Sequence, residues 1–226
     1  MRIVFGIGGS IICPRGLPDV LYLKRLSRFM VKLRQKHEII IIIGGGKMTK
    51  DYIKTTRKLK PSENLLDQMG ILGTRMNALT LVAALGKHAY PKVVENKEEL
   101  EHGIASKRIV VLGGTVPGQT TDAVAVAAAK FFRADLLIIG TNVKGVYDKD
   151  PHKYRNANML PKISPKEVYR MVRAKKHMAG PIGVMDQVAA KLLVDTRIKT
   201  VFLDGRKLDN MKNALQGKKF TGTVIG

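Results

Sequence analysis

One stretch constrains the fold of this chain more than any other: five consecutive isoleucines, Ile39–Ile43, run directly into three glycines, Gly44–Gly46. A continuous run of β-branched residues is typical of a strand that is buried on both faces, as in a parallel sheet. Glycines let the backbone approach a ligand closely, and a helical pattern starts directly after them. Because the first N–H groups of a helix attract anions, this stretch predicts a phosphate-binding turn at the end of a buried strand.

The composition is that of a globular chain that can bury a substantial core. Hydrophobic residues make up 45% of the 226 residues, which is enough for one domain. No apolar run seen in the sequence approaches the roughly 18 residues that cross a bilayer, and the amino-terminal residues lack the layout of a signal peptide. The single cysteine, Cys13, excludes an internal disulfide and fits a reducing compartment. We therefore expect a cytoplasmic protein that is not attached to a membrane.

The formal net charge is +22, from 40 Lys and Arg against 18 Asp and Glu. Such a charge attracts polyanions such as nucleic acids and nucleotides. The basic residues are spread along the chain, however, and six Tyr, six Phe and no Trp provide few stacking platforms for single strands. We therefore favour a cationic solvated surface over a dedicated nucleic-acid site.

Strand-like and helix-like segments alternate along the chain. Predicted strands lie at residues 2–7, 38–43, 93–94, 108–112, 135–139 and 199–203, and predicted helices at residues 19–36, 48–59, 61–85, 122–132, 165–172, 185–194 and 206–215. This alternation predicts an α/β fold with a mainly parallel sheet. Residues 144–165, which contain three prolines, are interpreted as an exposed excursion that a hairpin would fit. No segment has the composition of a linker, so a single domain is the economical interpretation.

Four of the strand segments end in glycine or small hydroxyl residues: Gly8-Gly9-Ser10, Gly44-Gly45-Gly46, Gly113-Gly114-Thr115 and Gly140-Thr141-Asn142. In open α/β sheets, ligands bind beyond the carboxyl ends of the strands. Four such turns in one chain favour a ligand with several phosphates. Neither the G-x-G-x-x-G fingerprint nor the G-x-x-x-x-G-K-[ST] loop is present, so the phosphate site is of another type.

The glycine turns belong to longer motifs that follow one another along the chain. These are Gly44-Gly45-Gly46-Lys47-Met48-Thr49-Lys50, Asp67-x-x-Gly70-Ile71 with Thr74-Arg75-x-Asn77-Ala78, Gly113-Gly114-Thr115-x-Pro117-Gly118-x-Thr120-Thr121-Asp122-Ala123, Thr141-Asn142-Val143-x-Gly145-Val146-Tyr147-x-x-Asp150-Pro151, Asp186-x-x-Ala189-Ala190-Lys191 and Gly222-Thr223-Val224-Ile225. In this order they resemble the motifs of the archaeal-type UMP kinases of the amino acid kinase family. The resemblance spans essentially the whole chain and is most specific at the proline–glycine–threonine motif.

The resemblance implies a three-layer αβα sandwich around a mainly parallel sheet, formed by one domain over residues 1–226. The acceptor-nucleotide part would cover roughly residues 1–135 and the ATP-binding part roughly residues 136–226. The implied reaction transfers the γ-phosphoryl group of ATP to UMP, giving UDP and ADP in pyrimidine nucleotide biosynthesis. The resemblance also implies Mg²⁺ that is carried with ATP, without a separate protein metal site, and a homohexameric enzyme.

The site residues follow from the same motifs. UMP would be bound by Gly45, Asp67, Thr115, Val116, Pro117, Gly118, Gln119, Thr120 and Thr121. ATP would be bound by Gly9, Ser10, Gly46, Lys50, Thr141, Asn142, Tyr147 and Asp150. Lys50 and Asp186 would act in catalysis, Asp186 by orienting the cations. These residue types suit the reaction, because phosphoryl transfer requires positioning and charge neutralisation rather than covalent chemistry.

Four residues depart from the family pattern. Lys50 stands where arginine is usual, Lys144 replaces an aspartate, Gln119 stands where histidine is common, and Gly6 occupies a position where lysine or aspartate is found. A lysine keeps the charge of an arginine but loses its bidentate fork for phosphate. These departures leave open whether the protein catalyses the reaction efficiently.

Other interpretations remain open at this point. Thr120 and Thr121 could cap the helix that follows them, and Asp186 could be a helix-terminal carboxylate. A second enzyme class is another phosphate kinase of the same fold, such as an isopentenyl phosphate kinase, although no histidine lies near the first glycine turns. The net charge and the departures also allow a catalytically weakened member that binds nucleic acid or regulates another process.

Overall fold

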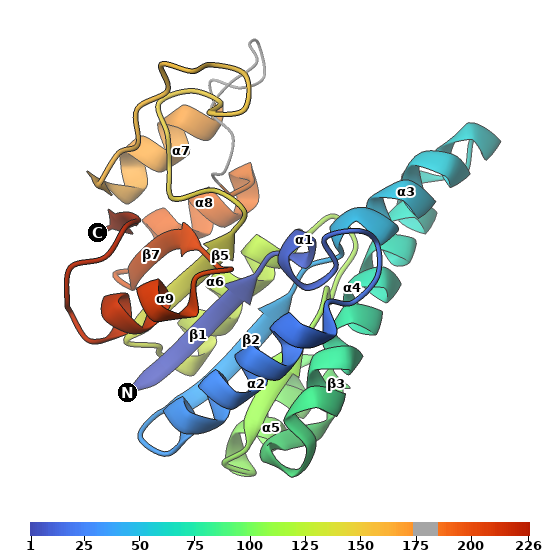
Figure 1. Ribbon diagram of the computed structural model, residues 1–226. Helices are drawn as coiled ribbons and strands as arrows, with labels where there is room; N and C mark the ends of the chain where they lie inside the picture. The colour runs from blue at the N-terminus through green and yellow to red at the C-terminus, as the bar shows by residue number, and fades with distance from the viewer. Residues whose placement is uncertain (174–184) are drawn as a thin grey trace.

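The computed structural model describes residues 1–173 and 185–226, and its centre is an eight-stranded sheet (Figure 1). The strand order is β3-β4-β2-β1-β5-β7-β8-β6. The strands are β1 (Arg2–Ile7), β2 (Glu38–Ile43), β3 (Ala89–Val94), β4 (Ile109–Leu112), β5 (Leu136–Thr141), β6 (Lys162–Ile163), β7 (Lys199–Asp204) and β8 (Thr223–Ile225). All pairings are parallel except that of β7 with β8, so the predicted α/β fold with a mainly parallel sheet is confirmed.

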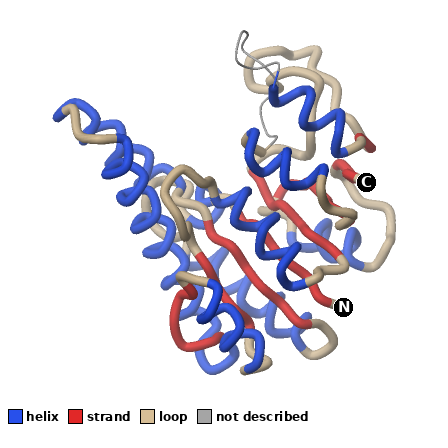
Figure 2. The backbone as a smooth tube through the Cα atoms, turned by 180° about the vertical axis from the view of Figure 1, so that it is seen from behind, coloured by secondary structure: helices blue, strands red, loops and turns tan. Residues whose placement is uncertain are grey.

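Helices cover both faces of the sheet, as Figure 2 shows from behind. They are α1 (Gly9–Ile12), α2 (Val20–Arg34), α3 (Gly46–Thr56), α4 (Glu63–Leu85), α5 (Lys97–Ala105), α6 (Thr121–Phe132), α7 (Pro165–Arg173), α8 (Gln187–Val194) and α9 (Leu208–Leu215), with 3₁₀ turns η1 (Arg57–Leu59) and η2 (Gly86–His88). One core layer packs the sheet against α2, α4 and α9, and the other packs it against α5, α6, α7 and α8. The three-layer αβα sandwich is therefore confirmed.

The five isoleucines of β2 divide between these two layers. Ile39, Ile41 and Ile43 join the layer of α2 and α4, whereas Ile40 and Ile42 join the layer of α6. β2 lies between β1 and β4, parallel to both, and each isoleucine is buried. Because burial of one such side chain contributes about 1.5–3 kcal/mol, this strand is a large part of the core. The structure confirms the strand that the sequence predicts here.

Several short elements are absent from the sequence interpretation. The clearest is α5, whose N-cap Asn96 accepts a hydrogen bond from Glu99 N, while Glu99 Oε2 accepts one from Glu95 N. Asn96 followed by Glu99 three residues later is the sequence signal of a capping box, although Glu99 here accepts from Glu95 N, one residue before the cap. β6, β8 and α1 have two to four residues each, too few for a periodic pattern. The 144–165 excursion does contain antiparallel pairing, between Tyr147 and Met159.

Helix α4 corrects the expectation that no segment is apolar enough to cross a bilayer. The segment Glu63–His88 reaches a mean hydropathy of 1.2, which by length and composition alone would permit a membrane span. A core helix passes the same test, and the inner side of α4 carries Leu66, Ala78, Leu81 and Leu85 into the protein. Its outer side leaves Leu65, Leu72, Met76 and Leu79 exposed, and these four residues are called the α4 ridge below.

Candidate active site

The turns that follow β1 and β2 touch each other backbone to backbone. These strands are parallel neighbours, so their carboxyl ends lie at the same edge of the sheet. A Cβ atom on Gly9 would collide with the Gly46 nitrogen and the Gly44 carbonyl. Gly46 itself has a φ of +71°, a conformation that favours glycine. The predicted glycine turns therefore form one continuous backbone surface that no side chain interrupts.

A buried asparagine of α4 fixes the direction of the second turn. Asn77 Nδ2 donates to the carbonyl oxygens of Gly44 and Gly45, at 2.9 and 2.8 Å, and Asn77 Oδ1 accepts from Cys13 Sγ at 3.1 Å. In a trans peptide the N–H lies opposite the carbonyl, so the N–H groups of Gly45 and Gly46 point away from Asn77. This arrangement directs them to the side from which an anion could approach.

A cavity of about 220 Å³ lies between α3, α4 and the loop that precedes α6, and we call it the α4 cavity. Asp67 closes one side of it, because its Oδ2 accepts a hydrogen bond from Gly118 N at 2.8 Å. Thr74 Oγ1 accepts from Gly114 N at 2.6 Å and so ties the same loop to α4. Of the predicted UMP residues, the lining includes Gly45, Asp67, Val116, Gly118, Gln119, Thr120 and Thr121.

A second cavity of about 280 Å³, called the β1 cavity, lies at the ends of β1, β2 and β5. Of the predicted ATP residues, its lining includes Gly9, Ser10, Gly46, Lys50 and Thr141. The two cavities share Gly45, Gly46, Lys50 and Thr121, so they meet at the β2 turn. Lys50 is exposed there and makes no ion pair within the described residues, whereas Lys47 on the same helix pairs with Asp51.

Two carboxyl groups lie at the start of α6 and α8. Asp186 caps α8 through Oδ1, which accepts from Val188 N and Ala189 N, and its Oδ2 accepts from the Thr120 hydroxyl. Thr120 in turn caps α6, so the helix-capping interpretation of both residues is confirmed. Asp122 lines the β1 cavity. Burial and the neighbouring Asp186 carboxylate raise the pKa of Asp122 from its ordinary 3.8 to about 6.

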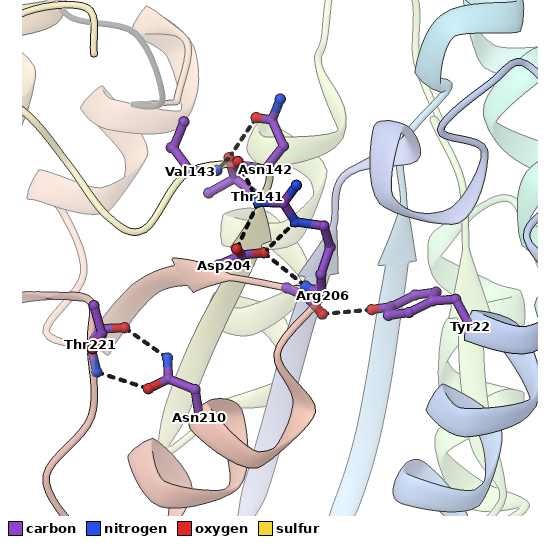
Figure 3. A network of polar contacts seen from close by, with 9 residues as sticks. Tyr22, Thr141, Asn142, Val143, Asp204, Arg206, Asn210 and Thr221 are labelled. Carbon is purple, nitrogen blue, oxygen red and sulfur yellow. Dashed lines mark hydrogen bonds and ion pairs between the residues drawn. The ribbon is translucent and has the colours of Figure 1, made fainter. Parts of the chain in front are cut away.

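The loops after β5 and β7 are joined by a polar network (Figure 3). The carboxylate of the buried residue Asp204 accepts from Arg206 Nε at 2.8 Å and from Arg206 Nη2 at 2.7 Å. Arg206 Nη2 also donates to the Asn142 carbonyl at 3.1 Å, and Tyr22 Oη donates to the Gly205 carbonyl at 2.8 Å. The Asp204 pKa is lowered, because the hydrogen bonds and charge of Arg206 outweigh its desolvation.

The remaining predicted residues do not line either cavity. Thr115 and Pro117 belong to the same loop as Gly118, and Asn142 follows Thr141 directly. Tyr147 and Asp150 lie farther along, in the 144–165 excursion. Asp150 is buried, and within the described residues its Oδ2 has no hydrogen-bond partner. A buried carboxylate oxygen without a partner is costly, which is consistent with a donor supplied by a ligand.

A further cavity of about 600 Å³ lies elsewhere, at the amino ends of the strands. Its walls include Arg34, His37, Lys107 and Phe132, and none of the glycine turns. Because ligands of open α/β sheets bind at the carboxyl ends, the smaller pair of cavities is the better candidate for the chemistry.

Residues 1–204 of the chain match the model of the amino acid kinase family. The chain belongs to this family. The uridylate kinase of Thermococcus gammatolerans is 40% identical over 225 residues, covering 100% of this chain and 99% of that protein, and that of Pyrococcus abyssi is 42% identical with the same coverage. The crystal structure of uridylate kinase from Archaeoglobus fulgidus superposes with a TM-score of 0.87 at 34% identity, covering 100% of both chains.

Some residues that shape this candidate site are not predicted from the sequence. Asp122 lies in the first turn of a helix that Thr120 caps, and an acidic residue at that position is a signal that the sequence carries. Asn77 and Arg206 act through carbonyl groups that are distant in sequence, so no local pattern could reveal them. Gly6 also gains a physical account: a Cβ there would lie 2.7 Å from Ile139 Cδ1, so Ile139 occupies the space that a side chain at position 6 would need.

Proposed function

We propose that this protein is a UMP kinase, which transfers the γ-phosphoryl group of ATP to UMP and yields UDP and ADP. The observation that carries the proposal is the junction of the α4 cavity with the β1 cavity at Gly45, Gly46, Lys50 and Thr121. Two nucleotides that occupy separate cavities would bring their phosphates together only there. The full-length similarity to uridylate kinases supports UMP as the acceptor.

The proposed roles of the residues combine the resemblance with the positions of the two cavities. UMP would occupy the α4 cavity, with Asp67 accepting hydrogen bonds from the nucleoside and with the 115–121 loop over it. The ATP phosphates would occupy the β1 cavity, where the backbone of Gly9, Ser10 and Gly46 supplies fixed donors. Thr141 and Asn142, followed by Tyr147 and Asp150, would line the adenosine side. Lys50, which faces both cavities, would neutralise the charge that moves between donor and acceptor.

The carboxylates present fit a divalent cation that arrives with ATP. Within the described residues no group of three or more His, Cys, Asp or Glu could hold a metal alone. Magnesium in such sites is bound by one or two carboxylates together with substrate phosphates. Asp122 and Asp186 would form such a pair, since burial and then the nearby Asp186 carboxylate raise the pKa of Asp122. Bound there, Mg²⁺ would stabilise the negative charge of the phosphates.

We also propose that the chain is a single domain and assembles with copies of itself, as in a homohexamer. The sheet is continuous across the proposed parts, since β1 of the acceptor part pairs with β5 of the ATP part. The α4 ridge carries no charge, although the molecule as a whole is strongly cationic. Two copies could bury this neutral ridge without bringing like charges together, which supports self-association. Soluble kinases of this kind would act in the cytoplasm, in pyrimidine nucleotide biosynthesis.

A substrate panel tests the proposed activity. ADP release is measured with ATP and Mg²⁺ in the presence of UMP, CMP, AMP, GMP, dTMP or isopentenyl phosphate, each with an enzyme-free control. We expect turnover with UMP well above all others. Absence of turnover with UMP would refute the proposal, and turnover with isopentenyl phosphate alone would assign the other phosphate kinase class. RNA binding that falls steeply with salt, in a protein without turnover, would support the regulatory class.

A further inference from the structure

We propose that Arg206 is a positioning residue for the donor nucleotide, which acts by holding the Thr141–Asn142 turn in one orientation. The inference rests on the proposed function, because it concerns the ATP side of the same site. β5 and β7 are adjacent parallel strands, and Thr141 is in register with Asp204. The turns that follow these two residues therefore lie side by side at the carboxyl edge of the sheet, next to the β1 cavity that Thr141 lines (Figure 3).

The guanidinium of Arg206 connects these two turns. One side of its fork is held by the Asp204 carboxylate, which is 5% exposed, through Nε at 2.8 Å and Nη2 at 2.7 Å. The same Nη2 donates to the Asn142 carbonyl, 64 residues away, at 3.1 Å. A lysine could not make this set of contacts, because it lacks the rigid planar fork.

The neighbouring carbonyl groups are held in the same way. Gly205 N donates to the Thr141 carbonyl at 2.9 Å, and Tyr22 Oη donates to the Gly205 carbonyl at 2.8 Å. The carbonyl oxygens of Thr141, Asn142 and Gly205 thus all point to donors within the protein. Thr141 lines the β1 cavity, where the ATP phosphates would lie. Carbonyl oxygens repel phosphate and N–H groups attract it, so a Thr141 carbonyl that turned into this cavity would oppose binding. The network removes that possibility.

Stability alone is a poor explanation of this arrangement. The Asp204 pair does contribute stability, because the Asp204 side chain is only 7% exposed. The contact with the Asn142 carbonyl comes from the guanidinium side, where the Arg206 side chain is 58% exposed, and contributes little to stability. Asp204 and Arg206 are also only two residues apart, so their pairing does not join distant parts of the fold. The long-range contact that the guanidinium makes in this network is with the Asn142 carbonyl. This contact fixes the orientation of the carbonyl, which affects a ligand that binds at the Thr141–Asn142 turn.

The test compares Arg206→Met and Arg206→Lys with a matched control, Arg34→Met. Arg34 also donates to a main-chain carbonyl, that of Lys107, through Nε at 3.2 Å and Nη2 at 2.8 Å, but at the opposite edge of the sheet. Measurements are KM for ATP and for UMP, kcat, ATP affinity by calorimetry without UMP, and the melting temperature. Calorimetry also reports on ATP binding if the protein does not turn over UMP.

We expect Arg206→Met to raise both KM and Kd for ATP roughly ten-fold or more, because a charged hydrogen bond is lost. The KM for UMP should stay within about two-fold of wild type. Arg206→Lys should also weaken ATP binding while the melting temperature stays near that of wild type. Arg34→Met should leave both KM values unchanged. Wild-type-like ATP binding by Arg206→Lys, or an equal loss for ATP and UMP that follows the melting temperature, would overturn the inference.

The two proposals fail in different ways. A wild-type protein that binds ATP without turning over UMP would refute the proposed kinase activity, and the calorimetric comparison of the Arg206 variants would still decide the positioning role. A wild-type protein that does not bind ATP at all would overturn both.

Discussion

Lys50 is the residue on which the proposed chemistry depends most. It lines both cavities, at the β2 turn where they meet. We expect Lys50→Met to lower kcat by roughly 10²–10³-fold, because a positioned charge at the transferring phosphoryl group is lost. Lys50→Arg should retain activity. The control is Lys47→Met, one turn earlier, since Lys47 pairs with Asp51. Equal rates for Lys50→Met and Lys47→Met in the ADP-release assay would contradict the role.

A second residue-scale prediction concerns Asp122, whose pKa is raised to about 6. In the unfolded chain this carboxyl ionises near 3.8, so folding holds the proton more tightly. The stability that the protonated form contributes is present below pH 3.8 and is lost as the pH rises through 6, at a cost of up to about 3 kcal/mol. Asp122→Asn should therefore be more stable than wild type at pH 8, by a margin that shrinks toward pH 4.5.

Denaturant unfolding at several pH values measures this margin, and a margin independent of pH would show that Asp122 is not the titrating group. Activity should move in the opposite direction. Because Asp122 is proposed to face the cation that accompanies ATP, Asp122→Asn should lose turnover with UMP while gaining stability.

At the scale of elements, the start of α6 combines a structural and a functional contact. Thr120 caps the helix and also donates to Asp186 of the α8 cap. Thr120→Ala should cost about 1 kcal/mol of stability and also reduce turnover, because the 115–121 loop loses its tie to α8. Ser62→Ala removes the cap of α4 and is the matched control, with a similar stability loss and normal turnover. Equal turnover in both variants would show that Thr120 only caps the helix and does not contribute to turnover.

The elements also show how far sequence reasoning reaches. β2, β4 and β5 are predictable because continuous aliphatic runs end in glycine, and α6 because a capping threonine precedes an alanine-rich stretch. The glycine turns and Asp67 were found because their chemistry is local to a motif. The carbonyl contacts of Asn77, Arg75 and Arg206 were not, because each depends on how distant segments pack.

At the scale of the whole molecule, the α4 ridge makes a prediction about assembly. Leu72 and Met76 are 62% and 57% exposed on a helix face without charge. A Leu72→Glu/Met76→Glu double variant should sediment as a smaller species than wild type, because the carboxylates would have to be buried between copies. Leu21→Glu changes a leucine of α2 that is 75% exposed and should leave the assembly intact. Identical sedimentation of the ridge variant and wild type would place the contact elsewhere.

The position of β1 in the sheet has a consequence for synthesis on the ribosome. β1 is made early, yet it lies between β2 and β5, and β5 follows more than 120 residues later. At translation rates of roughly 5–20 residues per second, one edge of this apolar strand stays without its partner for on the order of ten seconds. The nascent chain is therefore most prone to aggregate while the sheet is incomplete. Slow codons between β2 and β5 would lengthen the time for which the edge of β1 is exposed.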